Sequence, residues 1–128
     1  MQGVVAHLRV PGDLSWVGPV RRRVREVCGA LLGAPDRCDT LVLLTSELVT
    51  NAVMHAGGRV EVAVEVVGTR RLRVEVRDGS RELPRVQDAD SDAMGGRGLL
   101  LVDKLADAWG VEIAREGKSV WFELRLGP

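Results

Sequence analysis

The stretch Thr45-Ser-Glu-Leu-Val-Thr-Asn-Ala-Val-Met-His55 decides how the rest of the chain is interpreted. Glu47, Asn51 and His55 are four residues apart, so a helix would place all three on one face, one turn above another. The positions around them are mostly apolar, which is typical of a helix with one side buried against a core. A carboxylate and an amide one turn apart can share a divalent cation or orient a water against a phosphate. Taken alone, however, a polar stripe on an amphipathic helix is more often a solvated face.

Composition limits the classes of protein that fit the chain. Its 128 residues, 45% of them apolar and 28% charged, predict one globular domain over 1–128. A formal net charge of zero gives no global attraction to nucleic acid, and the basic run Arg21–Arg25 falls in a helical pattern that predicts a solvated face. We see no signal peptide and no apolar run of membrane-spanning length, so we expect a cytoplasmic protein with no membrane partner.

The two cysteines, Cys28 and Cys38, match no zinc or redox motif. No cluster of histidine and cysteine surrounds them in the sequence. We therefore expect both to be small buried hydrophobic residues in a reducing compartment.

Hydrophobic periodicity predicts an alternation of strands and helices. The expected strands are 4–10, 60–66, 71–77, 109–115 and 119–126, and the expected helices are 14–32, 35–56 and 99–105. The first strand is expected at a sheet edge, Val111 and Ile113 are expected to point inward, and Trp121 is expected on the exposed face. Clean alternation in the middle strands indicates a sheet with one wet face. The sequence thus predicts an α+β two-layer sandwich, with helices packed on one face of a mixed, mostly antiparallel sheet.

Two further stretches carry candidate site residues. Asp78-Gly79 ends a predicted strand, and a buried aspartate is costly unless it accepts hydrogen bonds, so Asp78 needs a donor. A loop of about fifteen residues follows, a length typical of lids or disordered segments. Gly95-Gly96-Arg97-Gly98 then opens directly onto an apolar helix, and such a helix start favours an anion such as phosphate. Each stretch alone also fits an ordinary turn.

In this order, the three stretches resemble the ATP-binding (Bergerat) fold shared by DNA gyrase, Hsp90, histidine kinases and MutL. Within that superfamily the chain, from Leu14 to Leu126, looks most like the small serine-kinase anti-sigma factors of bacteria. The resemblance implies ATP and Mg²⁺ as ligands. It also implies a protein partner, either a sigma factor or an anti-sigma-factor antagonist, and members of this group are commonly homodimers.

The resemblance implies a role for each matching residue. Glu47 matches the general base, Asn51 the ligand of the phosphate-bridging magnesium, and Asp78 the acceptor of the adenine amino group. The other matches are Gly79 beside the base, His55 near the nucleotide, the phosphate-binding box Gly96, Arg97, Gly98 and Leu99, and Ser119 as the hydroxyl that helps fix the adenine.

The chain departs from the family pattern after Asp78. The stretch Asp78-Gly-Ser-Arg-Glu-Leu-Pro84 lacks the second and third glycines of the usual first glycine box, and Arg97 is bulky for the second box. Two functions therefore stay open. One is a regulatory serine/threonine kinase that phosphorylates a small antagonist protein, sequesters a transcription regulator, or does both. The alternative is a nucleotide-binding regulatory module without kinase activity that acts by partner binding.

Overall fold

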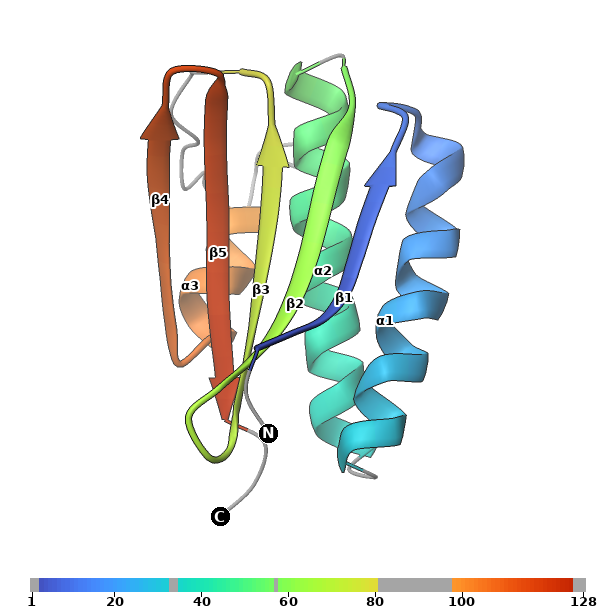
Figure 1. Cartoon of the computed structure of the whole chain (residues 1–128), viewed down its shortest axis with the longest axis vertical. Coiled ribbons are helices and arrows are strands. Elements are labelled where there is room, and N and C mark those ends of the chain that lie inside the picture. The colour runs from blue at the N-terminus through green and yellow to red at the C-terminus, as the bar shows by residue number, and fades with distance from the viewer. Residues whose placement is uncertain (1–2, 33–34, 57, 81–97, 126–128) are drawn as a thin grey trace.

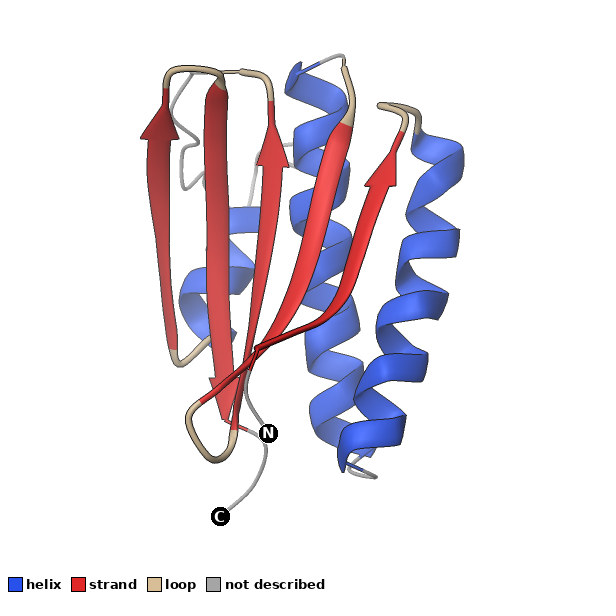
Figure 2. Ribbon diagram, viewed as in Figure 1, coloured by secondary structure: helices blue, strands red, loops and turns tan. Residues whose placement is uncertain are grey.

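The computed structural model describes residues 3–32, 35–56, 58–80 and 98–125 of the 128-residue chain. The elements in chain order are β1 (Gly3–Val10), the 3-10 turn η1 (Leu14–Trp16), α1 (Val17–Leu32), α2 (Pro35–Ala56), β2 (Val60–Val67), β3 (Arg71–Asp78), α3 (Gly98–Leu105), β4 (Ala108–Ala114) and β5 (Gly117–Arg125). The strands form one sheet in the order β1-β2-β3-β5-β4 (Figure 1). All three helices lie on the same side of this sheet (Figure 2), so the predicted two-layer α+β sandwich is confirmed.

The sheet buries the face that the sequence alternation predicts. Every pairing among the described strands is antiparallel, so this part of the sheet is not mixed as expected. In β2 and β3 the inward positions pair directly, as with Val62 and Val76 or Val64 and Val74, and all four side chains are buried. Their neighbours in sequence are mostly charged and point to the open face, which holds the sheet in one register. β1 lies at an edge, as predicted.

The helix layer is built around α2, which lies between α1 and α3 (Figure 1). Leu41, Leu44, Leu48 and Val49 turn inward from α2 and are at most 3% exposed. The predicted start of the first helix at Leu14 is instead the 3-10 turn η1, which Asp13 caps by accepting a hydrogen bond from the Ser15 backbone N–H at 2.9 Å. The arginines of α1 at 21–23 and 25 are exposed, as predicted. No helix within the described ranges has the length and apolarity needed to cross a membrane.

The cysteine prediction is half right. Cys28 and Cys38 are buried, with exposures of 0% and 4%, but they are joined in a disulfide with their Cα atoms 5.7 Å apart. α1 and α2 form an antiparallel hairpin, so the last turns of one helix face the first turns of the next. Cys28 and Cys38 are therefore close together in the fold, although their spacing in the sequence matches no motif. A bond that closes a loop of this size contributes about 2–3 kcal/mol to folding stability.

In the last hairpin Ile113 is more exposed than expected, whereas Trp121 lies on the face of the sheet that the sequence predicts. Ile113 is 43% exposed, because β4 is the other edge strand and Ile113 lies near its end. Trp121 is half-buried on the open face, with the Arg73 guanidinium 4.1 Å from its ring centroid. Its ring lies over Gly110, where an added Cβ would come within 2.7 Å of the indole. A glycine in the neighbouring strand therefore lets the tryptophan lie flat on the sheet.

Candidate functional site

The polar stripe of α2 is present as the sequence predicts. Glu47 and Asn51 are half-buried one turn apart on a continuous helix, and His55 is exposed in its last turn. Packing of Leu48 and Ala52 against the core fixes the rotation of α2, so these three side chains lie at the margin of the helix layer.

The stripe lies on the flank of α2 that faces away from α1. Asp39 marks the α1 side, because its Oδ1 accepts a hydrogen bond from Arg25 Nη1 at 2.7 Å. With 3.6 residues per turn, Thr50 lies close to the same side as Asp39, whereas Asn51 is rotated about 120° from it. α3 packs against α2 on the side away from α1 (Figure 1). The carboxylate and amide of the stripe are therefore on the α3 side of the helix layer.

Asp78, the last residue of β3, is buried with its side chain 3% exposed. It follows the inward positions Val74 and Val76 by strand alternation, so its carboxylate is on the helix side of the sheet. The Oδ1 atom accepts hydrogen bonds from the Ser80 backbone N–H at 2.8 Å and from Lys118 Nζ at 3.1 Å. The Oδ2 atom lies 3.1 Å from the same ammonium. The expectation that Asp78 needs a donor is met within the chain by Lys118.

The strand register separates Ser119 from Asp78. Asp78 pairs with Lys118, and Ser119 pairs with Arg77. Lys118 therefore shares the helix side of the sheet with Asp78, whereas Ser119 belongs to the open face. The structure does not bring the Ser119 side chain together with Asp78, and it supplies Lys118 in that place. The signal was available in the sequence, because counting back in steps of two from the apolar positions Phe122 and Val120 arrives at Lys118.

Two glycines shape the backbone around Asp78. Gly117 has a φ of 151°, and an added Cβ would collide with the Asp78 carbonyl oxygen, so only glycine lets the start of β5 approach the end of β3. Gly79 is different, because an added Cβ there would meet nothing within 4 Å among the described atoms. The place of Gly79 next to a base stays a prediction.

The predicted phosphate-binding box is described only in part. Gly96 and Arg97 lie outside the described residues, and Gly98 is the first residue of α3, as the sequence predicts for a helix opening on glycine. The Leu99 side chain is 1% exposed and belongs to the core. Leu99 can therefore contact a ligand only through its backbone, whose N–H is among the free donors of a helix start.

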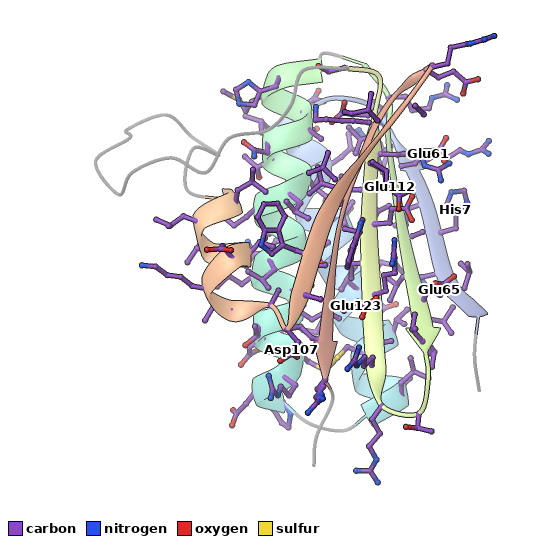
Figure 3. All side chains as sticks on the ribbon, turned by 90° about the vertical axis from the view of Figure 1, so that its left-hand side faces the viewer. His7, Glu61, Glu65, Asp107, Glu112 and Glu123 are labelled. Atoms are coloured by element: carbon purple, nitrogen blue, oxygen red, sulfur yellow. A yellow bond between two sulfur atoms is a disulfide. The ribbon has the colours of Figure 1, made fainter. Side chains whose placement is uncertain are left out.

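The open face of the sheet carries several ion pairs. A hollow of about 380 Å³ lies there, away from the helices, and His7, Glu61 and Glu65 project from this side (Figure 3). His7 Nε2 is 3.2 Å from Glu61 Oε2, and Arg77 donates to Glu75 at 3.0 Å. This hollow is on the opposite side of the sheet from Glu47, Asn51 and Asp78, so it is no part of the candidate site.

Glu75, on the open face, has its pKa shifted. Burial would raise the pKa of Glu75, but the Ser119 hydroxyl and the Arg77 and Arg73 guanidiniums outweigh burial, and the net effect lowers the pKa. The Ser119 hydroxyl lies on the open face with Glu75, although within the described residues its buried oxygen has no hydrogen bond of good geometry.

The donor set on α2 fits a magnesium ion that arrives with a nucleotide. Within the described residues, no group of three or more His, Cys, Asp or Glu side chains could hold a metal ion by itself. Magnesium does not require such a group, because it keeps several waters and binds through one or two protein oxygens plus phosphates. The Asn51 amide oxygen and the Glu47 carboxylate are suitable oxygens on one flank.

Comparison with known proteins decides the family. The family model for the histidine kinase-like ATPase domain matches residues 10–124. The chain belongs to this family. As a histidine kinase-like ATPase domain it is an ATP-binding domain of a regulatory kind, and the superfamily predicted from the ordered motifs is confirmed.

Solved structures agree with this membership. Fourteen chains match, among them the histidine kinase domain of a blue-light activated histidine kinase from Erythrobacter litoralis, at 25% sequence identity and a TM-score of 0.56. The match covers 91% of the present chain but only 62% of that structure. No curated protein matches the chain.

Proposed function

We propose that the chain is an ATP–Mg²⁺-binding regulatory protein of the anti-sigma-factor serine/threonine kinase type. It would phosphorylate a small antagonist protein, sequester a transcription regulator, or do both, in the cytoplasm. Like members of the group that it resembles, it would do so as a homodimer. The observation that carries the proposal is the pair Glu47 and Asn51, half-buried one turn apart on the α3 side of α2. A carboxylate that can act as a base and an amide that can bind magnesium are two of the groups that phosphoryl transfer uses.

Each residue of the proposed site would have a separate role in nucleotide binding or phosphoryl transfer. Asp78 would accept a hydrogen bond from the adenine amino group, and the backbone N–H groups at the start of α3 would bind phosphate oxygens. Asn51 would be the protein ligand of magnesium, which when bound neutralises charge that develops on the transferred phosphoryl group. Glu47 would accept the proton of the attacking serine hydroxyl. The new bond joins the serine oxygen to the γ-phosphorus, the bond from that phosphorus to the bridging oxygen breaks, and ADP leaves.

Calorimetric titration with ATP, with and without Mg²⁺, tests the binding site. Asn51→Ala is expected to abolish magnesium-dependent binding while leaving the fold intact, because the side chain is half-exposed and outside the core. Thr50→Ala is a matched control, since Thr50 is also half-buried on α2 but lies on the α1 side. A folded Asn51→Ala protein that binds ATP–Mg²⁺ as the wild type does would remove the metal-ligand assignment.

The second candidate is a nucleotide-binding regulatory module without kinase activity. The departure of Asp78-Gly-Ser-Arg-Glu-Leu-Pro84 from the usual glycine box favours it. Thiophosphate transfer from ATPγS to proteins of a lysate of the source cells separates the two functions. A kinase labels a substrate protein, and Glu47→Gln, which preserves shape and removes the base, binds ATP but labels nothing. A wild-type protein that binds ATP and labels no more than Glu47→Gln would favour the binding module.

A further inference from the structure

Asp78 and Lys118 form a charged pair that the proposed function does not use in full. The Lys118 side chain is 7% exposed and that of Asp78 is 3% exposed. The chain has only two lysines, and the other, Lys104, is exposed on α3. Lysine is rarely buried without a partner or a task, and Lys118 is buried beside the group that the proposed ATP site assigns to the base.

The hydrogen bonds that the described residues donate to Asp78 do not use all the acceptor positions of its carboxylate. A carboxylate has about four acceptor positions, two on each oxygen. Among the described residues, Oδ1 accepts from the Ser80 N–H and from Lys118, whereas Oδ2 has only Lys118 within reach. Asp78 is therefore left with one open acceptor position, on Oδ2. An ammonium has three N–H donors, and two at most are directed at the two carboxylate oxygens, so Lys118 retains one donor beside that position.

We propose that Lys118 is a base-contacting residue that determines nucleotide specificity, an inference that rests on the proposed ATP site. An open acceptor next to a free donor matches the edge of adenine, on which an amino group (a donor) adjoins the ring nitrogen N1 (an acceptor). Asp78 Oδ2 accepts from the amino group, and Lys118 Nζ donates to N1. The pair thus reads two adjacent positions of the base with one residue from each of two paired strands.

The same arrangement disfavours guanine. Guanine presents a carbonyl oxygen where adenine has its amino group, and this oxygen would meet Oδ2 as one acceptor against another. A base shifted by one position could offer its N1–H and N2–H donors, but these need both carboxylate oxygens. Oδ1 is already occupied by the Ser80 N–H and Lys118, so the second donor would be left buried without an acceptor.

The experiment measures calorimetric binding of ATP and of 1-deaza-ATP, in which a C–H group replaces N1, to the same proteins. The wild type is expected to bind 1-deaza-ATP about tenfold more weakly or worse, the usual effect of losing one hydrogen bond to a charged group. Lys118→Met, of similar shape but without a donor, is expected to bind both nucleotides equally. Lys104→Met is the matched control and is expected to discriminate as the wild type does.

Each outcome has one meaning. Equal binding of ATP and 1-deaza-ATP by the wild type overturns the inference, and so does undiminished discrimination in Lys118→Met, because another group would then read N1. A wild type that binds no ATP overturns the proposed ATP site itself. If Lys118→Met does not fold, Asp78→Leu with Lys118→Met, which removes both charges and leaves no donor at either position, is expected to bind both nucleotides more weakly and to show the same loss of discrimination.

Discussion

Removing the charge of Lys118 should destabilise the fold by several kcal/mol, because it leaves the Asp78 carboxylate buried without its cation. The charges are 3.1 Å apart and both side chains are more than nine-tenths buried. Coulomb's law at an effective dielectric constant of about 20 gives about 5 kcal/mol for that separation, and breaking buried pairs typically costs about 3–5 kcal/mol. The Ser80 N–H still donates to Oδ1 in the variant, so we expect a loss of about 3 kcal/mol for Lys118→Met.

The assay is equilibrium urea unfolding followed by circular dichroism at neutral pH, without nucleotide. Lys104→Met, an exposed site, should change the free energy of unfolding by no more than about 0.5 kcal/mol. Asp78→Asn combined with Lys118→Met should recover most of the loss, because no charge remains buried. A Lys118→Met protein within about 1 kcal/mol of the wild type would refute the reasoning, since a buried carboxylate left without its cation is expected to cost more than that.

Three further predictions concern stability. Replacing both cysteines, Cys28→Ser with Cys38→Ser, should lower the free energy of unfolding by about 2–3 kcal/mol in urea titrations, and dithiothreitol should weaken the wild type but not the variant. Gly117→Ala should lower the melting temperature far more than Gly79→Ala, because a Cβ at Gly117 meets the backbone of the facing strand and one at Gly79 meets open space; equal shifts would contradict the described register. The pKa of Glu75 is lowered on folding, so its contribution to stability is present above the unfolded value of 4.5 and is lost as pH falls through the folded value. Glu75→Gln should accordingly lose less stability than the wild type in urea titrations as the pH falls from about 5 to about 3. An equal loss of unfolding free energy in the two proteins over this range would show that folding does not stabilise the Glu75 carboxylate.

Features that are set within a single helix or strand can be predicted from the sequence. The helical spacing of Glu47 and Asn51 places them on one flank, and the alternation of β2 and β3 predicts which of their residues are buried. Both follow from the fixed periods of a helix and a strand. The order of the motifs then indicates the superfamily, because only their succession along the chain is specific.

What depends on two elements together is harder to predict. Cys28 and Cys38 meet only because α1 and α2 pack as a hairpin, and their spacing along the chain carries no trace of it. The choice between Lys118 and Ser119 depends on the register of β5 against β3. A shift of one residue exchanges the two faces of a strand, so matching a hydroxyl to a family position by residue type alone selects the wrong side of the sheet.

At the Asp78–Lys118 pair, the effect of a substitution on folding stability can be measured separately from its effect on nucleotide recognition. A buried ion pair adds little stability over an uncharged pair of similar shape, so stability alone gives no reason for a lysine at position 118. Recognition does give one, because a leucine and a methionine in those places would have the shape of the pair but supply no donor for N1. Asp78→Leu with Lys118→Met should therefore unfold like the wild type and yet no longer distinguish ATP from 1-deaza-ATP. If it regained stability and still discriminated, Lys118 would be only a counter-ion, and the base would be read by another part of the chain.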